Sequence, residues 1–393
     1  MKLLFLANRT PYPPYRGDKL KIYNLAKRLC HKHELHLLTF AQTEEDLGYK
    51  QELEKVFKEV HFIHLPKSKS ALNCLTAVWN PLPVQVLYFQ SAAMQKAVDQ
   101  LLLQHTYDAI HVQHLRMAPY LSGRKEIPRI LDLPDAFSLY WERRRAMNKN
   151  PVIKAFERLE QKRVLAYEPV MKQYDLSLAC SAEDVAYLRE KHHATNLELL
   201  PNGVDLDTFK ARDHDYSHNH TLLFTGNMDY APNVDAVIYF TQEVFPLIHA
   251  KYPDVRFVIA GQRPVDKVKE LANEHIHVTG FIEDLAATYN EASIVVAPLR
   301  FGAGTQNKVL EAMAMGVPVV CSHIGFNGLG IHNGEGAFME TQPASFAERV
   351  IELLDNAALR ESTGKKGMEV ITGKFSWDRI ALQLENYFLQ VRK

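Results

Sequence analysis

Short apolar runs of strand length alternate with longer segments of helical period along the chain. This alternation is typical of βα units around buried parallel sheets, so it predicts the α/β class. In the first half, the runs predict strands at residues 3–7, 35–40, 60–65, 109–112, 129–133 and 176–180. In the second half, they predict strands at residues 222–225, 256–260, 275–279, 294–297 and 317–321. Each half therefore has enough strands for a doubly wound sheet of its own.

The two halves meet at Pro201-Asn202-Gly203-Val204-Asp205, a turn-forming stretch that follows a short strand. We place one domain at residues 1–200 and a second at residues 201–375. Residues 376–393 begin with Ser376-Trp377-Asp378 and continue as an amphipathic segment, so they predict a final helix.

The amino-acid composition is that of an ordinary soluble protein, and it excludes several other classes. Hydrophobic residues make up 47% of the 393 residues and charged residues 23%, as in ordinary soluble proteins. No apolar run approaches the ~18 residues that span a bilayer, and the run at residues 3–7 is shorter than a secretory signal core. The four cysteines form no Cys-x-x-Cys pair, which argues against a zinc site or a disulfide framework and favours a reducing cytoplasm.

The net charge of zero conceals an asymmetry between the halves. Residues 1–200 carry 29 Lys and Arg against 22 Asp and Glu, whereas residues 201–393 carry 17 against 24. The first half is therefore suited to an anionic partner, such as a phosphate-bearing substrate or an acidic membrane surface; alternatively, the opposite charges help two lobes associate. The overall neutrality argues against nucleic-acid binding.

The densest motif is the loop Arg300-Phe301-Gly302-Ala303-Gly304-Thr305, between a predicted strand and a helix expected to begin near Thr305. A glycine-rich loop at a helix N-terminus offers N–H groups and a positive dipole end to an anion. We expect Arg300 and Lys308 to converge on a diphosphate, and Glu311, one turn further, to accept hydrogen bonds from sugar or ribose hydroxyls. The alternative is a tight βαβ turn in which glycine serves packing alone.

Three more glycines follow predicted strands of the second half and belong to the same sheet edge: Gly226-Asn227, Gly261-Gln262-Arg263 and Gly280-Phe281-Ile282. Arg263 would add a phosphate contact, and the backbone at Phe281 and Ile282 would contact a base. Taken alone, each glycine is equally explained as a simple turn.

With these motifs in place, the chain resembles glycosyltransferase family 4, the retaining nucleotide-sugar enzymes of the GT-B fold. The stretches that carry the resemblance are Pro14-Tyr15-Arg16-Gly17-Asp18, residues 201–205, Val278-Thr279-Gly280-Phe281 and residues 308–320. Within the family, residues 111–118 and 300–305 are similar to a subgroup associated with bacterial exopolysaccharide and exosortase loci.

The resemblance implies two facing Rossmann-like domains, with the helix at 376–393 crossing back to the first. It implies a cytoplasmic enzyme, at the inner face of the membrane, that transfers a sugar with retention to a glycan or lipid-linked acceptor. A UDP- or GDP-sugar is the expected donor, and no cofactor or metal is expected because Arg263, Arg300, Lys308 and the helix end can meet the phosphate charge. The expected donor-binding residues are Gly226, Asn227, Arg263, Phe281, Ile282, Arg300, Gly304, Thr305, Lys308 and Glu311.

In the first domain we expect His111, His114 and Asp18 at the reaction centre, since histidine can orient a hydroxyl or exchange protons near neutral pH. The expected acceptor-binding residues are Arg16, Gly17, Arg116 and Asp135. The chain departs from the family pattern at Ala303, where the family has a second glutamate, and at residues 226–230, where it often has a basic pair. A third departure is Gln113, which aligns with the usual catalytic-site histidine; His111 or His114 would substitute for it.

The segment from Trp141 to Arg163 is cationic, with Met147, Ile153, Phe156 and Leu159 interleaved. It fits either a contact with anionic lipid headgroups or a solvated helix that packs through its apolar stripe.

Two alternatives to a transferase stay open: a non-catalytic nucleotide-sugar-binding protein, and a Rossmann enzyme of another class. A nicotinamide-dependent enzyme would carry Gly-x-Gly-x-x-Gly after its first strand, and neither residues 6–19 nor residues 224–235 contain it.

Overall fold

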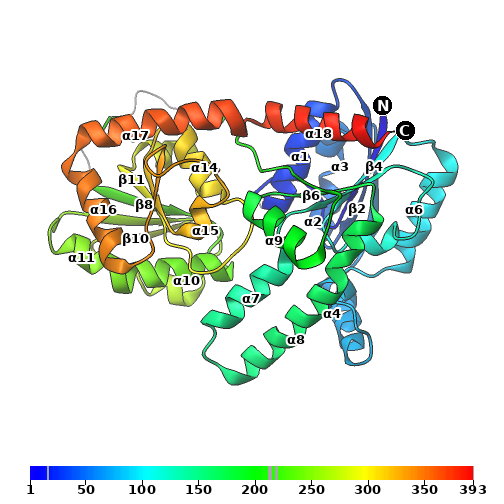
Figure 1. Cartoon of the computed structure of the whole chain (residues 1–393), viewed down its shortest axis with the longest axis horizontal. Coiled ribbons are helices and arrows are strands. Elements are labelled where there is room, and N and C mark those ends of the chain that lie inside the picture. The colour runs from blue at the N-terminus through cyan, green and yellow to red at the C-terminus, as the bar shows by residue number, and fades with distance from the viewer. Residues whose placement is uncertain (16, 211–214, 217–219, 393) are drawn as a thin grey trace. The chain divides into compact units, whose positions relative to one another are not determined.

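The computed structural model describes residues 1–15, 17–210, 215–216 and 220–392 (Figure 1). The chain forms two compact units: unit 1 is Met1–Pro201 with Trp377–Lys393, and unit 2 is Asn202–Ser376. Both divisions fall within one residue of the boundaries expected from the sequence. Arg16, one of the expected acceptor-binding residues, lies outside the described residues.

Unit 1 is built on a seven-stranded parallel sheet in the order β3-β2-β1-β4-β5-β6-β7. Its strands are β1 (Lys2–Ala7), β2 (Glu34–Ala41), β3 (Glu59–His64), β4 (Ala109–Gln113), β5 (Arg129–Leu133), β6 (Leu176–Ala179) and β7 (Leu197–Leu199). Almost every residue of β1, β4 and β5 is buried, as expected for strands that are covered on both faces.

The helices of unit 1 cover both faces of this sheet. They are α1 (Gly17–Leu29), α2 (Glu44–Gly48), α3 (Lys50–Glu54), α4 (Lys67–Leu75), α5 (Val84–Leu87), α6 (Ala92–Gln104), α7 (Phe137–Met147), α8 (Pro151–Tyr167), α9 (Ala182–His192) and α18 (Trp377–Val391). Short 3-10 helices lie at η1 (Thr76–Val78), η2 (Ala118–Tyr120) and η3 (Glu168–Gln173). Alternate residues of β1 divide between the two faces: Leu3 and Phe5 face α1 and α18, and Leu4 and Leu6 face α6.

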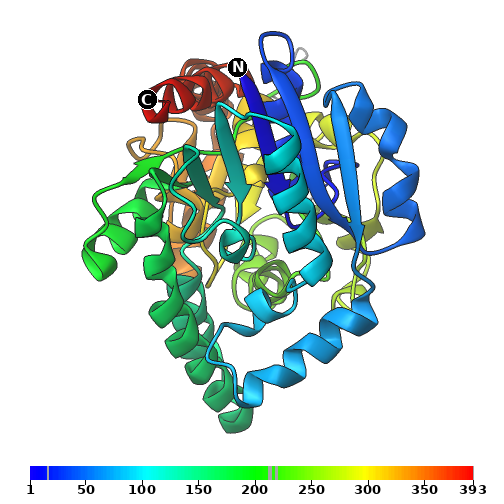
Figure 2. The same cartoon turned by 90° about the vertical axis from the view of Figure 1, so that its right-hand side faces the viewer.

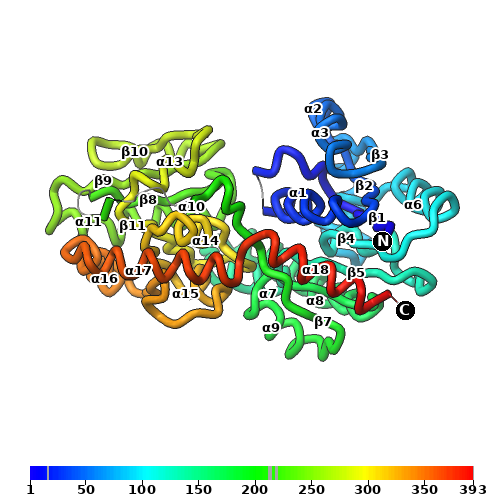
Figure 3. Tube along the Cα trace, turned by 90° about the horizontal axis from the view of Figure 1, so that it is seen from above, coloured from blue at the N-terminus to red at the C-terminus, as the bar shows by residue number. Residues whose placement is uncertain are grey.

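The final helix, α18, packs along α1 although the two are far apart in sequence (Figure 3). Trp377 and Phe388 are buried in the core beneath it. At its surface, Arg28 Nε donates to Asp378 Oδ1 at 3.2 Å, and Lys32 Nζ donates to Glu385 Oε2 at 3.0 Å. The chain thus returns to unit 1 after completing unit 2.

Unit 2 has a six-stranded parallel sheet in the order β10-β9-β8-β11-β12-β13. Its strands are β8 (Thr221–Thr225), β9 (Arg256–Ala260), β10 (Ile276–Gly280), β11 (Ile294–Ala297), β12 (Val319–Cys321) and β13 (Ala337–Met339). Its α-helices are α10 (Ala231–Tyr239), α11 (Phe245–His249), α12 (Asp266–Lys269), α13 (Leu285–Asn290), α14 (Asn307–Ala314), α15 (His323–Phe326), α16 (Pro343–Asp355) and α17 (Ala357–Val370). The π-helical turns η4 (Phe240–Val244) and η5 (Ile371–Phe375) continue α10 and α17.

Both sheets have the doubly wound arrangement expected from the alternation of apolar runs and helical segments. The strands at residues 129–133, 256–260 and 294–297 have the predicted bounds. Two strands were not predicted as such: β13, whose three residues follow a glycine-rich stretch, and β7, which we had merged with the boundary between the domains. Among the described residues, no helix is long and apolar enough to cross a membrane.

Candidate functional site

The loops after β8 and β11 lie where the strand order of unit 2 reverses, because these two strands are neighbours. Open α/β sheets bind ligands at the carboxyl ends of such strands. Two glycines with positive φ, Gly226 and Gly261, allow the backbone segments of neighbouring loops to approach each other at this edge. A Cβ atom on Gly261 would lie 1.7 Å from the carbonyl oxygen of Gly226, so the loops after β8 and β9 meet backbone to backbone.

Lys308 lies in the first turn of α14 and is only 8% exposed. Its Nζ donates one hydrogen bond, to Asn233 Oδ1 at 2.9 Å, and lies 4.8 Å from the centre of the Phe224 ring. An ammonium group has three N–H donors, so two of them find no acceptor among the described residues. Burial lowers the pKa of Lys308 to about 8, although Glu311 opposes the shift. A buried cation with unused donors is suited to bind an anion.

Glu311 lies on the same face of α14, one turn after Lys308. Its Oε2 accepts a hydrogen bond from the Tyr289 hydroxyl at 2.9 Å, and that hydroxyl lies 2.7 Å from Thr225 Oγ1. Burial raises the pKa of the Glu311 carboxyl, while Tyr289 and Lys308 oppose the rise. Its second oxygen, Oε1, accepts no hydrogen bond from the described residues. One oxygen is therefore fixed and the other is available to a ligand hydroxyl.

The glycine-rich loop leads into α14, which begins at Asn307, two residues later than expected. Gly302 and Gly304 have φ values of 146° and 75°, a region that favours glycine. The N-cap residue, Gln306, makes no side-chain capping hydrogen bond, and its Nε2 instead donates to the Ala303 carbonyl at 3.3 Å. The helix N-terminus next to Lys308 thus keeps its attraction for an anion.

Arg300 does not join Lys308 as the sequence had predicted. Its Nε donates to Asp235 Oδ2 at 2.8 Å, its second nitrogen donates to the other carboxylate oxygen, and the guanidinium lies 4.8 Å from the centre of the Tyr239 ring. The hydrogen bond to Asp235 raises the pKa of Arg300. In this structure Arg300 therefore forms an ion pair with Asp235 of α10, whereas Lys308 bonds to a neutral amide of the same helix.

The remaining expected donor-binding residues lie on the loops after β8, β9 and β10. Gln262 Nε2 donates to Asn227 Oδ1 at 2.8 Å, which ties two of these loops together. Arg263, with φ of 58°, is exposed, and its guanidinium lies 3.6 Å from the Asp229 carboxylate. Phe281 is exposed and Ile282 half-buried. The structure thus places these residues at the carboxyl edge, as the sequence predicted.

Sequence reasoning missed the partners of Lys308, Arg300 and Glu311, which are Asn233, Asp235 and Tyr289. Asn233 and Asp235 are polar positions in α10, a helix that is otherwise largely apolar and directly follows the Gly226 loop, so a signal was present. Tyr289 lies on α13, far from any glycine motif, and no sequence pattern marks it.

In unit 1, the structure corrects the prediction for His111. This residue is the third of β4 and is fully buried, with its ring 4.9 Å from that of Phe5 and 6.3 Å from that of Phe388. Its Nε2 lies 3.2 Å from Asp132 Oδ2, beside Lys21. Because α18 covers this cluster, His111 is a core residue and does not reach a substrate.

His114 and Gln113 lie where β4 ends. His114 has φ of 79°, its Nδ1 accepts a hydrogen bond from the backbone N of Arg116 at 3.2 Å, and its ring lies 4.7 Å from that of Phe137. Burial lowers the pKa of His114 well below its usual value. Gln113 Nε2 donates to the carbonyl oxygen of Asp18. At this edge of the sheet, the His114 imidazole is therefore neutral, and the neighbouring Gln113 contacts the start of α1.

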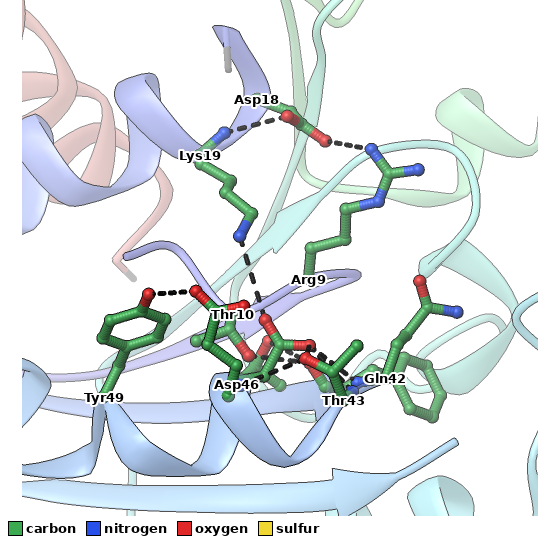
Figure 4. A network of polar contacts seen from close by, with 11 residues as sticks. Arg9, Thr10, Asp18, Lys19, Gln42, Thr43, Asp46 and Tyr49 are labelled. Atoms are coloured by element: carbon green, nitrogen blue, oxygen red, sulfur yellow. Dashed lines mark hydrogen bonds and ion pairs between the residues drawn. The ribbon is translucent and has the colours of Figure 1, made fainter. Parts of the chain in front are cut away.

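Asp18 belongs to the polar network drawn in Figure 4. Its Oδ2 lies 3.2 Å from an Arg9 guanidinium nitrogen, and its Oδ1 accepts from the backbone N of Lys19 at 3.0 Å. Lys19 Nζ in turn lies 3.9 Å from Asp46, which forms a capping box with Thr43 at the start of α2. Both oxygens of Asp18 thus hold the first turn of α1 in place.

Asp135 and Arg116 follow β5 and β4 at the same edge of unit 1, and Gly17 begins α1. Burial, with a contribution from Asp184, raises the pKa of Asp135 to about 7. The Arg116 guanidinium lies 5.3 Å from the centre of the Phe89 ring, and its Nε donates to Gln85 Oε1 at 3.3 Å. These residues are placed as expected for an acceptor-binding edge.

Potential metal ligands come together at two places in the described chain, both in unit 1: His36 with Glu59 and His105, and Asp135 with Cys180 and Asp184. Unit 2 contains Asp-x-Asp triplets at residues 205–207 and 213–215, and Asp213 lies outside the described residues. Asp205 Oδ1 accepts from the backbone N of Asp207 at 3.2 Å, and its Oδ2 accepts from Thr208 Oγ1 at 3.4 Å. The first triplet thus stabilises a local turn.

Comparison with known proteins finds a glycosyltransferase family model for each of the two units. A family model described as Glycosyltransferase Family 4 matches residues 22–208, and one described as Glycosyl transferases group 1 matches residues 219–356. An uncharacterized 44.6 kDa protein in the cps region of Klebsiella pneumoniae is 24% identical over 375 residues, which are 90% of this chain and 91% of that protein. The capsular polysaccharide biosynthesis glycosyltransferase CapM of Staphylococcus aureus is 24% identical over 201 residues, 48% of this chain and 52% of that protein.

Solved structures show the same fold. Sucrose-phosphate synthase from Thermosynechococcus elongatus superimposes with a TM-score of 0.74 at 15% identity, over 100% of this chain and 99% of that one. HepE of Anabaena, in complex with UDP and glucose, gives a TM-score of 0.71 at 17% identity, over 99% of this chain and 100% of that one. With matches to the family in both units and two parallel Rossmann-like sheets, the chain belongs to glycosyltransferase family 4 and has the GT-B fold.

Proposed function

We propose that this chain transfers a sugar, with retention, from a nucleotide diphosphate sugar to a glycan or lipid-linked acceptor during the synthesis of a bacterial surface polysaccharide. The observation that carries the proposal is Lys308, a buried ammonium with two unused N–H donors, one helical turn from the half-satisfied carboxylate of Glu311. Related proteins support it: HepE of Anabaena forms a complex with UDP-glucose, and CapM is a glycosyltransferase of capsular polysaccharide biosynthesis.

Different residues of unit 2 bind different parts of the donor. Lys308 and the N-terminus of α14 bind the diphosphate, and Glu311 accepts hydrogen bonds from ribose hydroxyls. Arg263, on the exposed loop after β9, adds a second cation. Backbone groups at Phe281 and Ile282 contact the base, and a UDP- or GDP-sugar is the proposed donor.

The proposed transfer needs neither a metal ion nor a strong protein base. The bond between the anomeric carbon and the diphosphate oxygen breaks, and the acceptor oxygen bonds to the same face of that carbon. The acceptor hydroxyl proton passes to the departing phosphate oxygen, whose charge Lys308 and the helix end stabilise. In unit 1, His114 and Asp135 orient the acceptor, and the reaction takes place at the cytoplasmic side of the membrane.

A second candidate is a nucleotide-sugar-binding protein without transferase activity. Two observations favour it: Ala303 stands where the family has a glutamate, and His111, one of the two histidines that would replace the missing catalytic histidine, is sealed in the core.

The test is a screen of nucleotide diphosphate sugars by thermal shift, followed by incubation of each stabilising donor with the protein. Slow release of the nucleoside diphosphate in the absence of acceptor is expected from the enzyme, whereas binding without release identifies the second candidate. With an acceptor, proton NMR of the product, with and without excess chelator, tests retention and metal independence. An inverted product, or activity that chelator abolishes and magnesium restores, contradicts the mechanism.

A further inference from the structure

Exposed apolar side chains are concentrated in one part of unit 1. Eighteen large apolar side chains are exposed in the described chain, and nine of them lie in two short segments, residues 72–79 and 147–159. Val78, Trp79 and Val152 are 85%, 76% and 77% exposed. The others in the two segments are Leu72, Leu75, Met147, Ile153, Phe156 and Leu159. We call these nine side chains the apolar surface.

Helix α8 is amphipathic, but it buries mostly polar residues and exposes its apolar ones. Three of its four buried residues are polar, namely Glu157, Glu160 and Gln161, whereas its apolar stripe faces outward. A helix that packs on a protein core normally buries its apolar stripe. The structure therefore contradicts the interpretation of residues 141–163 as a helix that packs through that stripe, and it leaves the apolar residues for a partner outside unit 1.

Polar contacts hold the two segments together. The Arg163 guanidinium donates to the Ala77 carbonyl, and Glu160 Oε1 accepts from the backbone N of Val84 at 2.8 Å. Glu157 Oε1 lies 2.8 Å from Arg144 Nε, which fixes α8 on α7. Figures 1 and 2 both show α4 and α8 extending away from the sheet of unit 1, and in Figure 2 the two helices approach each other at the end that lies far from the sheet. The apolar surface is thus presented on a braced pair of helices.

The charge around this surface is strongly positive. Residues 137–163 carry eight Lys and Arg against three Asp and Glu, and residues 66–91 add Lys67 and Lys69 with no acid. Two of the three acids, Glu157 and Glu160, are buried and pair with Arg144 and Arg163, and Arg143 pairs with Glu183. The exposed cations of residues 137–163 are Lys149, Lys154, Arg158 and Lys162. Exposed lysines and arginines therefore flank the apolar surface with little opposing charge.

We propose that the apolar surface and its basic flank dock unit 1 on an anionic lipid bilayer. An exposed tryptophan, aliphatic side chains and interleaved lysines and arginines are the features by which interfacial helices bind membranes. The flanking positive charge selects anionic headgroups, whereas a purely apolar face would fit a second copy of the chain equally well. This proposal goes beyond the proposed function, because no residue of the donor site takes part in it.

Co-sedimentation of the full chain with vesicles tests the proposal. One set is pure phosphatidylcholine, and the other contains one-third phosphatidylglycerol. The protein is expected to bind the anionic vesicles at least tenfold more tightly than the neutral ones. This binding is expected to weaken at high salt, because exposed charges are screened. Equal binding to both sets, or no binding to either, overturns the proposal.

Variants separate the apolar from the electrostatic contribution. Val78→Ser with Val152→Ser, and Lys149→Glu with Lys154→Glu, are each expected to weaken vesicle binding at least tenfold, whereas Leu103→Ser, an exposed leucine on α6, leaves it unchanged. A wild-type melting temperature in every variant shows that the fold is intact, and stabilisation by UDP or GDP is measured separately, so failure of the membrane proposal is distinguishable from failure of the donor site. If both double variants bind as wild type, the surface is not the docking site.

Trp79 reports directly on insertion. Its fluorescence emission is expected to shift to shorter wavelength on anionic vesicles, and Trp79→Phe is expected to lose the shift while still sedimenting. A sedimentation-velocity run without lipid tests the other occupant: a dimer that Val78→Ser dissociates would show that the surface joins two copies and would contradict the proposal.

Discussion

Among the described residues, each unit buries one lysine beneath the carboxyl edge of its sheet, and the two lysines differ in their partners. Lys21 in unit 1 is 3% exposed and donates to Asp132 Oδ1 at 2.7 Å and to the Leu200 carbonyl at 2.9 Å. Lys308 in unit 2 is 8% exposed and donates only to the neutral amide of Asn233. In unit 1 a carboxylate bonds directly to the lysine, whereas in unit 2 the Glu311 carboxylate makes no hydrogen bond with Lys308, although its charge still favours the protonated lysine.

The comparison shows that burial alone does not identify a binding residue. A buried charge with a charged partner stabilises the fold once both are in place, and removal of one partner is costly. A buried charge that no carboxylate contacts directly lowers stability, and it marks a candidate site for an anionic ligand. The two lysines should therefore respond to substitution in opposite ways.

The largest expected effect is on the fold of unit 1. Lys21→Met leaves the buried Asp132 carboxylate without its cation, and it should lower the free energy of unfolding by about 3–5 kcal/mol. Chemical denaturation followed by circular dichroism measures the loss. Adding Asp132→Leu should recover much of it, because the orphaned charge is then gone. A loss below about 1 kcal/mol would mean that the pair is not structural.

Lys308→Met should weaken ligand binding without lowering the stability of the fold. UDP binding, measured by isothermal titration calorimetry, should weaken about 10- to 150-fold, which corresponds to the roughly 1.5–3 kcal/mol of a charged hydrogen bond. Without ligand, the melting temperature should stay the same or rise, because a desolvated charge has been removed. Lys267→Met, at an exposed lysine of the same unit, is the matched control and should change neither quantity. A large loss of stability in Lys308→Met would contradict the contrast with Lys21.

Glu311→Gln should change selectivity more than stability. The carboxylate is expected to bind ribose hydroxyls, so the variant should lose about 1–1.5 kcal/mol toward UDP and nothing toward the deoxyribose analogue that lacks the bonded hydroxyl. Titrations of UDP, 2′-deoxy-UDP and 3′-deoxy-UDP into both proteins measure this. Equal losses for all three ligands would show that Glu311 acts through the fold and not through the ribose.

The last effect depends on pH and concerns Asp135, whose pKa is raised to about 7 in the folded chain. Its unfolded pKa lies near 3.9, so the folded state binds the extra proton between these values and loses stability as the pH rises through them. Asp135→Asn should therefore stabilise unit 1 at pH 8, by at least the ~1.4 kcal/mol of one pKa unit, and have little effect at pH 4. Melting curves at the two pH values test this; an equal effect at both would show that the carboxyl is not desolvated.

The sequence predicted the parts of the molecule that follow from local patterns. Apolar runs marked β5, β9 and β11 because buried parallel strands are continuously apolar, and the glycine loop placed Lys308 and Glu311 one turn apart on one helix. The partners of Lys308 and Glu311 come from α10 and α13, and only the three-dimensional fold reveals them. For the same reason, the sequence did not reveal that Arg300 pairs with Asp235, because nothing local indicated that this carboxylate would reach it. His111 resembled a site residue by its position in the strand, but the helix that buries it is more than 260 residues away.

The central claim is that the Lys308 ammonium binds the diphosphate, and the pH dependence of UDP binding tests it most directly. With a pKa of about 8, Lys308 is mostly charged at pH 7 and mostly neutral at pH 9, so affinity should fall roughly tenfold between them. Binding at pH 8 should take up roughly half a proton, measured from titrations in buffers of different ionisation enthalpy, because the bound anion restores the charge. Affinity that stays constant from pH 7 to 9, with no proton uptake, would contradict the account.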